Sequence, residues 1–155
     1  MRESNASASE LPSFVHQSER GELRMWLAAP TVLVFKYKGY SDGGYIPFVE
    51  DVWTRTLASQ TRPTYVFVDC EDQTGYAPAF RTGIEEWARR VVPTTHTYCL
   101  FVKSRLVAMG ITLARLAVGG PADRAEVVSD RNTFRSKLET AVRRSFYEND
   151  LQSKT

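Results

Sequence analysis

The sequence predicts an α/β protein with a mainly parallel sheet of about five strands, an N-terminal hairpin and four main helices. Two short runs, Tyr65–Val68 and Tyr98–Val102, are continuously apolar, which is typical of strands covered on both faces. Around them, amphipathic segments repeat apolar residues at spacings of three and four, which indicates helices. Strands that alternate with helices imply right-handed crossovers, and therefore a parallel core with helices on its faces.

The first half of the chain predicts a hairpin followed by a helix. Leu23–Leu27 and Val32–Tyr37 are strand-like runs separated by Pro30. A glycine-rich turn covers Gly39–Gly44, and a helix follows over Tyr45–Ser59 with one apolar stripe. The turn lacks the Lys-Ser/Thr ending of a phosphate-binding P-loop, so we do not expect nucleotide binding there.

The second half alternates helices with strands. A helix is predicted over Pro78–Val92, because Pro93 cannot continue it. A helix over Ser104–Val118 is apolar on most of its surface and should be the most buried. Glu126–Val128 reads as a short edge strand. The last helix, capped by Ser129 or Asp130, should face inward with Phe134, Leu138, Ala141, Val142 and Phe146.

The two ends of the chain predict tails around one domain. Residues 1–18 are rich in Ser, Asn, Ala and Glu, and offer little to bury, so a disordered tail is expected there. Residues 148–155 predict a second, flexible tail, which leaves residues 19–147 as a single domain. Neither a membrane-spanning run nor the apolar core of a signal peptide is present, so we expect a cytoplasmic protein without membrane insertion.

Composition excludes several classes of function. Twenty basic residues against eighteen acidic ones, without clustering, give no electrostatic basis for nucleic-acid binding. Cys70 and Cys99 lie in or beside apolar runs and predict two reduced, buried thiols rather than a disulfide scaffold. His16 and His96 are the only histidines, which is too few for a metal site of ordinary spacing. We therefore expect no metal and no cofactor.

No catalytic constellation is recognisable. The sequence has no Gly-x-Ser-x-Gly elbow, and neither histidine lies in the context of a catalytic triad. Cys70 is surrounded in sequence by carboxylates, which should raise its pKa rather than activate it. The sequence therefore predicts a protein that is not an enzyme.

The segment after Val68 is the most informative candidate site. Asp69, Glu71 and Asp72 place three carboxylates within four residues, at the carboxyl end of a predicted parallel strand. A solvated acidic loop that caps the next helix is favoured over a cation site. Lys103 and Arg105 lie at the same expected edge, and we favour their pairing with Glu71 and Asp72 over the binding of an anion.

Two segments resemble a known group of domains. The run from Val66 through Asp69 to Thr74-Gly75, with Trp87 near the end of the next helix, resembles the STAS-like domains, which include anti-sigma-factor antagonists. The segment KSRLVAMG, which starts at Lys103, is similar to small STAS/SEC14-like bacterial proteins, many of them myxobacterial. The resemblance covers about residues 20 to 147 and implies a STAS-like fold.

The resemblance also implies a regulatory position. Anti-sigma-factor antagonists carry an Asp-Ser-Ser-Gly type of motif whose second serine is phosphorylated by a partner kinase. Asp72-Gln73-Thr74-Gly75 resembles that motif and places Thr74 at the phosphorylatable position, whereas Gln73 replaces the first serine and the loop is shorter. The partner-docking loop implied in this way comprises Glu71, Asp72, Gln73, Thr74, Gly75, Tyr76, Lys103, Ser104 and Arg105.

Two functions from different classes remain open on this basis. The leading hypothesis is a non-enzymatic module that binds a protein partner, such as a kinase or regulator, in bacterial signalling. The alternative is a small-molecule or lipid-binding protein with an apolar pocket under the helices near Trp53, Tyr76 and Trp87. The sequence is also compatible with a homodimer.

Overall fold

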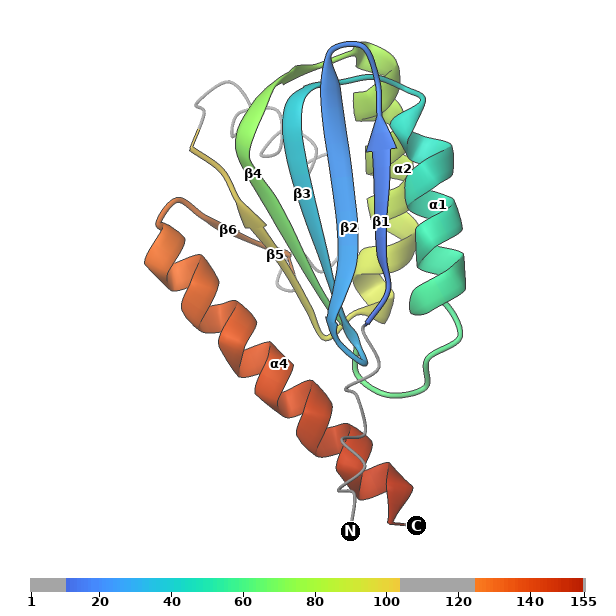
Figure 1. Ribbon diagram of the computed structural model, residues 1–155, viewed down its shortest axis with the longest axis vertical. Coiled ribbons are helices and arrows are strands. Elements are labelled where there is room, and N and C mark those ends of the chain that lie inside the picture. The colour runs from blue at the N-terminus through green and yellow to red at the C-terminus, as the bar shows by residue number, and fades with distance from the viewer. Residues whose placement is uncertain (1–10, 104–124, 155) are drawn as a thin grey trace, which may run out of the picture.

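The computed structural model describes residues 11–103 and 125–154, which form one mixed sheet covered by helices on both faces (Figure 1). Its strands are β1 (Ser13–Gln17), β2 (Gly21–Ala29), β3 (Val32–Ser41), β4 (Tyr65–Tyr76), β5 (Thr97–Phe101) and β6 (Ala125–Val128). Its α-helices in these ranges are α1 (Tyr45–Thr56), α2 (Pro78–Val91) and α4 (Arg131–Ser153), and a short 3-10 turn covers Val92–Thr94.

The strands lie side by side in the order in which they occur along the chain. β1, β2 and β3 form an antiparallel meander, whereas β3, β4, β5 and β6 are parallel. Tyr65 lies opposite Thr97, so the prediction that the two apolar runs are parallel neighbours in one sheet is confirmed. Successive right-handed crossovers in one direction place α1 and α2 on the same face, and α4 covers the other (Figure 1).

In the described part of the chain the sheet has six strands rather than about five, because residues 13–17 form a strand where the sequence predicts a disordered tail. Only two residues of this strand face inward, so the alternation of inward and outward residues is too short to be recognised in the sequence. His16 is one of them, and its ring contacts Tyr45 and Phe48 of α1 with centroids 5.2 Å apart in each case. These contacts supply the apolar burial that holds the strand on the sheet.

The C-terminal end of the domain also differs from expectation. α4 continues to Ser153, so the flexible tail predicted from residue 148 is helical through that residue. The side chain of Phe146 is 45% exposed rather than inward, and the buried position on that turn belongs to Ser145. Glu148 accepts a hydrogen bond from Tyr65, and Arg62 donates one to Asn149. Polar contacts therefore stabilise the part of the helix that lies beyond its apolar stripe.

Of the four predicted main helices, the one over Ser104–Val118 lies outside the described residues. The other three begin at nearly the predicted positions, and α4 extends beyond its predicted end. Among the described helices, none combines the length and the apolar content needed to cross a membrane.

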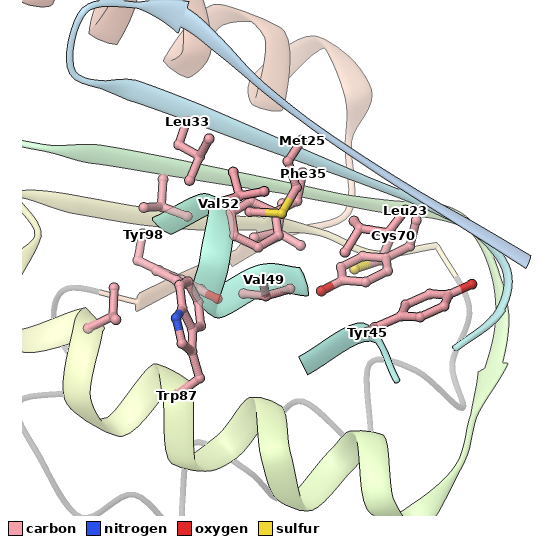
Figure 2. Packing of buried hydrophobic residues seen from close by; sticks show 14 of the residues in the cluster. Leu23, Met25, Leu33, Phe35, Tyr45, Val49, Val52, Cys70, Trp87 and Tyr98 are labelled. Atoms are coloured by element: carbon pink, nitrogen blue, oxygen red, sulfur yellow. The ribbon is translucent and has the colours of Figure 1, made fainter. Parts of the chain in front are cut away.

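The core consists of two clusters, one on each face of the sheet. The α1/α2 cluster includes Leu33, Phe35, Tyr37, Tyr45, Val49, Val52, Trp87 and Tyr98, and the α4 cluster includes Val32, Val34, Tyr65, Phe67, Phe101 and Phe134. Figure 2 shows Val49 and Val52 of α1 and Trp87 of α2 directed toward sheet residues such as Phe35.

Both cysteines are buried and free, as predicted, one in each cluster. Burial raises the pKa of Cys99 to about 12 and raises the pKa of Cys70 further, with the neighbouring Asp69 as a second cause. Both thiols are therefore protonated and unreactive at neutral pH.

Candidate functional site

The predicted acidic loop is a continuation of strand β4. The sequence predicts that the strand ends at Val68, but β4 runs on to Tyr76 because β3 continues beside it as far as Ser41. On its other side, β4 pairs with β5 only as far as Asp69, which lies opposite Phe101. The last part of β4 therefore extends beyond β5, and we call Asp72–Tyr76 the β4 overhang.

Two bulges interrupt the pairing of the overhang with β3. One lies between Asp69 and Asp72, and the second lies where Gln73 is opposite Gly39 and Gly75 is opposite Tyr40. Thr74 is the extra residue of the second bulge and its side chain is exposed. Bulges re-aim side chains and end regular pairing, so they explain why an alternating pattern is not visible in this stretch.

Gln73 points the other way and is buried. Its amide nitrogen donates a hydrogen bond of 3.0 Å to the hydroxyl of Ser41, which is also buried. This buried contact holds the overhang against β3. Gln73 is thus a structural residue of the overhang and not part of the exposed surface expected from the sequence.

A group of ion pairs lies at the base of the overhang. Asp69 is only 5% exposed and its Oδ2 is 3.1 Å from the guanidinium of Arg131, the first residue of α4. The same guanidinium pairs with Glu71, which also binds Lys103 at 2.8 Å. The backbone N–H of Glu71 donates to Asp69 at 3.0 Å. Both carboxylates are therefore occupied by contacts that attach α4 to the sheet.

The expected cross-edge pairing is present in part. Lys103 binds Glu71 as favoured from the sequence, whereas Asp72 pairs with Lys36 of β3 at 3.7 Å. Ser104 and Arg105 lie outside the described residues. Of the remaining predicted docking residues, Asp72, Thr74 and Lys103 are exposed, and Glu71, Gly75 and Tyr76 are partly buried.

The overhang does not cap the following helix, contrary to expectation. The N-cap of α2 is Ala77, which offers no side-chain cap, and the first turn of α2 carries no acidic residue. Because β4 runs to Tyr76, the carboxylates of Asp69 and Asp72 lie in the strand and not at the helix terminus. They bind basic side chains instead.

Arg131 and Lys36 are the residues that sequence reasoning missed. Arg131 follows β6, and the carboxyl ends of parallel strands meet at one edge, so its place in the fold could have identified it. The guanidinium also stacks 4.8 Å above the ring of Phe101, at the end of β5. No spacing in the sequence indicates the pairing of Lys36 with Asp72. The pairing depends on the bulge between Asp69 and Asp72 in β4.

The three aromatic residues expected around an apolar pocket, Trp53, Tyr76 and Trp87, all belong to the α1/α2 cluster or pack against it. Trp87 packs edge-to-face on Trp53 with centroids 5.8 Å apart, whereas Tyr76 lies near Phe80 toward the start of α2. A hollow of about 200 Å³ does lie beside Trp53, between the ends of α1 and α2. Its lining includes Leu57, Gln60, Thr64, Arg90 and Val91.

No family model and no curated protein matches the chain. Among solved structures, it is similar to an uncharacterised protein of the DUF3478 family from Shewanella loihica PV-4, described as having a SpoIIAA-like fold. The similarity covers 83% of this chain and 94% of that protein, with 12% identity and a TM-score of 0.55. The chain therefore has a SpoIIAA-like fold, which confirms the STAS-like fold predicted from the sequence.

Proposed function

We propose that this chain is a non-enzymatic interaction module that binds a protein partner through the β4 overhang and Lys103. The observation that carries the proposal is the exposed strand segment beyond β5, with Asp72 and Thr74 on its surface. Among the described residues, no strand pairs with the β5-side edge of this segment. A strand edge that the described residues leave unpaired, with exposed polar side chains beside it, suits recognition by another protein.

The chemistry around the overhang supports binding rather than catalysis. Asp69 and Glu71 are neutralised by Arg131 and Lys103, and the pKa of Cys70 is raised by burial. The ion pairs of Asp69 and Glu71 with Arg131 hold α4 in place. None of the described groups around the base of the overhang is therefore a free base or a free nucleophile. A SpoIIAA-like fold presenting such a surface is consistent with the docking role implied by the resemblance to anti-sigma-factor antagonists.

Phosphorylation of Thr74 by a partner kinase is the regulation that we propose for this surface. Thr74 is exposed and has no partner in the β3 register, so a phosphate would displace no ladder contact. Basic side chains of the meander lie nearby. Lys38 precedes Gly39, and Gly39 lies opposite Gln73, the residue before Thr74. Gly75, the residue after Thr74, lies against the ring of Tyr40. The guanidinium of Arg20 stacks 4.0 Å over the same ring. Lys103 is already engaged by Glu71.

The test compares variants as bait in parallel affinity captures from the native cell extract. A partner of the overhang should be retained by wild type and Thr74→Ala, and lost with Thr74→Glu or Asp72→Lys. The added charge at Thr74 should weaken binding by about tenfold or more. Thr54→Glu, an exposed change on α1, is the matched control and should bind like wild type. Equal capture by Thr74→Ala and Thr74→Glu would reject the switch.

A second candidate function is the binding of a small amphipathic molecule in the hollow beside Trp53. Its volume of about 200 Å³ is below the roughly 300–1,000 Å³ of pockets that enclose drug-sized ligands, so a long acyl chain should not fit. Native mass spectrometry of the purified protein would support this function by a retained small molecule that Leu57→Trp displaces. A spectrum containing only the unliganded mass would count against it.

A further inference from the structure

The outer edge of β1 carries a regular row of backbone groups that no other described residue pairs with. Leu27 N–H donates to the carbonyl of Pro12, and Ser18 N–H donates to the carbonyl of Gly21. In an antiparallel pair, hydrogen-bonded residues alternate with residues that point away from the partner. Phe14 and His16 therefore bond to β2, whereas the N–H and C=O groups of residues 13, 15 and 17 point outward.

The same three residues also expose their side chains. Phe14 packs against the α1/α2 cluster, and the ring of His16 lies on Tyr45 and Phe48. Residues 13, 15 and 17 face the other way and are exposed, with Val15 at 48%. The edge therefore combines outward backbone donors and acceptors with an exposed apolar side chain at its centre.

Within the described residues, the opposite edge of the sheet has protecting features that the β1 edge lacks. β6 has only four residues and carries Glu126, which pairs with Lys137 of α4 at 3.0 Å. Natural proteins commonly protect edge strands by charged residues, proline or bulges. β1 reads Ser-Phe-Val-His-Gln, with no Lys, Arg, Asp, Glu or Pro, and its register with β2 is regular over all five residues.

We propose that the β1 edge binds the β1 edge of a second copy of this chain, so that the two sheets become one. The strands would run antiparallel around a two-fold axis at Val15. That register places Ser13 opposite Gln17 of the second copy, and Val15 opposite Val15. Two uncharged polar pairs flank an apolar pair, so the edge is complementary to itself and brings no like charges together.

The size of the contact sets its expected strength. An edge of five residues buries little area, and interfaces well below about 1,200 Å² are typical of weak or transient association. The expected behaviour is therefore a monomer–dimer equilibrium in the micromolar range. This interface lies on the opposite side of the meander from the β4 overhang, so it does not depend on the proposed docking function.

Sedimentation velocity of the full chain over a concentration series tests the proposal. Val15→Pro removes an outward N–H and leaves every β1–β2 hydrogen bond in place, because the N–H of residue 15 does not belong to that ladder. It should weaken dimerisation at least about tenfold. Val15→Thr keeps the N–H and the β-branched shape and should dimerise like wild type.

Val15→Lys provides a second route that leaves the backbone untouched. It brings two ammonium groups together at the axis and should also abolish the dimer, with partial recovery at high salt. If Val15→Pro proves unfolded by circular dichroism, Val15→Lys decides the question. A wild-type protein that stays monomeric to about 1 mM, or a dimer that Val15→Lys leaves intact, would overturn the proposal.

Discussion

The two faces of the sheet hold their helices by different means. On the α1/α2 face, aromatic rings form a continuous series in which Tyr37 contacts Phe35, Tyr45 and Phe80, and Phe35 contacts Trp87. On the α4 face, Phe134 contacts Phe67 and Phe101, and polar contacts act at both ends of the helix. Burial on the first face is shared by many residues, whereas the position of α4 depends on a few specific groups.

The polar contacts at the two ends of α4 also differ from each other. At its start, the charged Arg131 binds Asp69 and Glu71 at the carboxyl end of β4. Toward its end, the hydroxyl of Ser145 accepts a hydrogen bond of 2.9 Å from the N–H of Thr31, in a fully buried and uncharged contact. The first attachment should respond to salt, and the second should not.

The largest effect should come from the α1/α2 face. Trp87 is 1% exposed and packs on Trp53, Phe35 and Tyr98, so Trp87→Ala removes a large buried volume. We expect a loss of about 3–5 kcal/mol in the free energy of unfolding, measured by urea denaturation. Trp26→Ala is the matched control on the α4 face, where Trp26 is only partly buried. An equal loss in both variants would contradict the contrast between the faces.

The next largest effect should come from the charged attachment of α4. Arg131→Met leaves the buried carboxylate of Asp69 without its guanidinium, and should cost about 2 kcal/mol, less than for a fully buried pair because Arg131 is partly exposed. Lys103→Met removes an exposed partner of Glu71 and should cost under about 1 kcal/mol. Urea denaturation of both variants gives the comparison. Equal losses would mean that the burial of Asp69 does not matter.

The uncharged attachment should follow closely. Ser145→Ala leaves the buried N–H of Thr31 without an acceptor and should lower stability by about 1–2 kcal/mol, with no dependence on salt. Ser136→Ala, an exposed change on the same helix, should be neutral or slightly stabilising. Thermal unfolding at two salt concentrations separates this loss from that of Arg131→Met. A salt-dependent loss for Ser145→Ala would contradict the assignment.

The same contrast explains how much of the fold could be predicted from the sequence. The apolar runs of β4 and β5, and the stripes of α1 and α2, are large periodic signals, and they predicted the parallel core and one helix-covered face. The end of α4 was predicted wrongly because a polar residue, Ser145, occupies a position of its inward stripe. Periodicity read from apolar residues alone placed Phe146 there instead.

The candidate site was predicted in composition but not in geometry. The carboxylates after Val68 were recognised, and so was the pairing of Lys103 with Glu71. The two bulges concealed the strand, because alternation fails at each extra residue. The partner of Asp69 came from Arg131, more than sixty residues away, and only the parallel order of the strands brings the two together.

The smallest effect should come from the N-cap of α4, where the two faces differ once more. α1 and α2 begin without a side-chain cap, whereas Asp130 accepts hydrogen bonds from the N–H and the hydroxyl of Thr133, at 2.9 and 2.8 Å. These hydrogen bonds to the ionised form hold the pKa of Asp130 below its ordinary value. Among the three described α-helices, the one that relies on individual polar contacts is thus also the one with a side-chain cap.

The pH dependence of that cap follows from the direction of the pKa shift. Because the folded pKa is depressed, the stabilisation is complete above the unfolded value of about 3.9 and is lost as the pH falls through the folded value. Asparagine caps a helix as well as aspartate but does not titrate. Asp130→Asn should therefore match wild type at neutral pH and lose less stability in acid, whereas Asp130→Ala should be weaker already at neutral pH. Urea denaturation at pH 7 and about pH 3 measures the difference. Identical acid losses in wild type and Asp130→Asn would show that the carboxylate of Asp130 contributes nothing beyond the geometry of the cap.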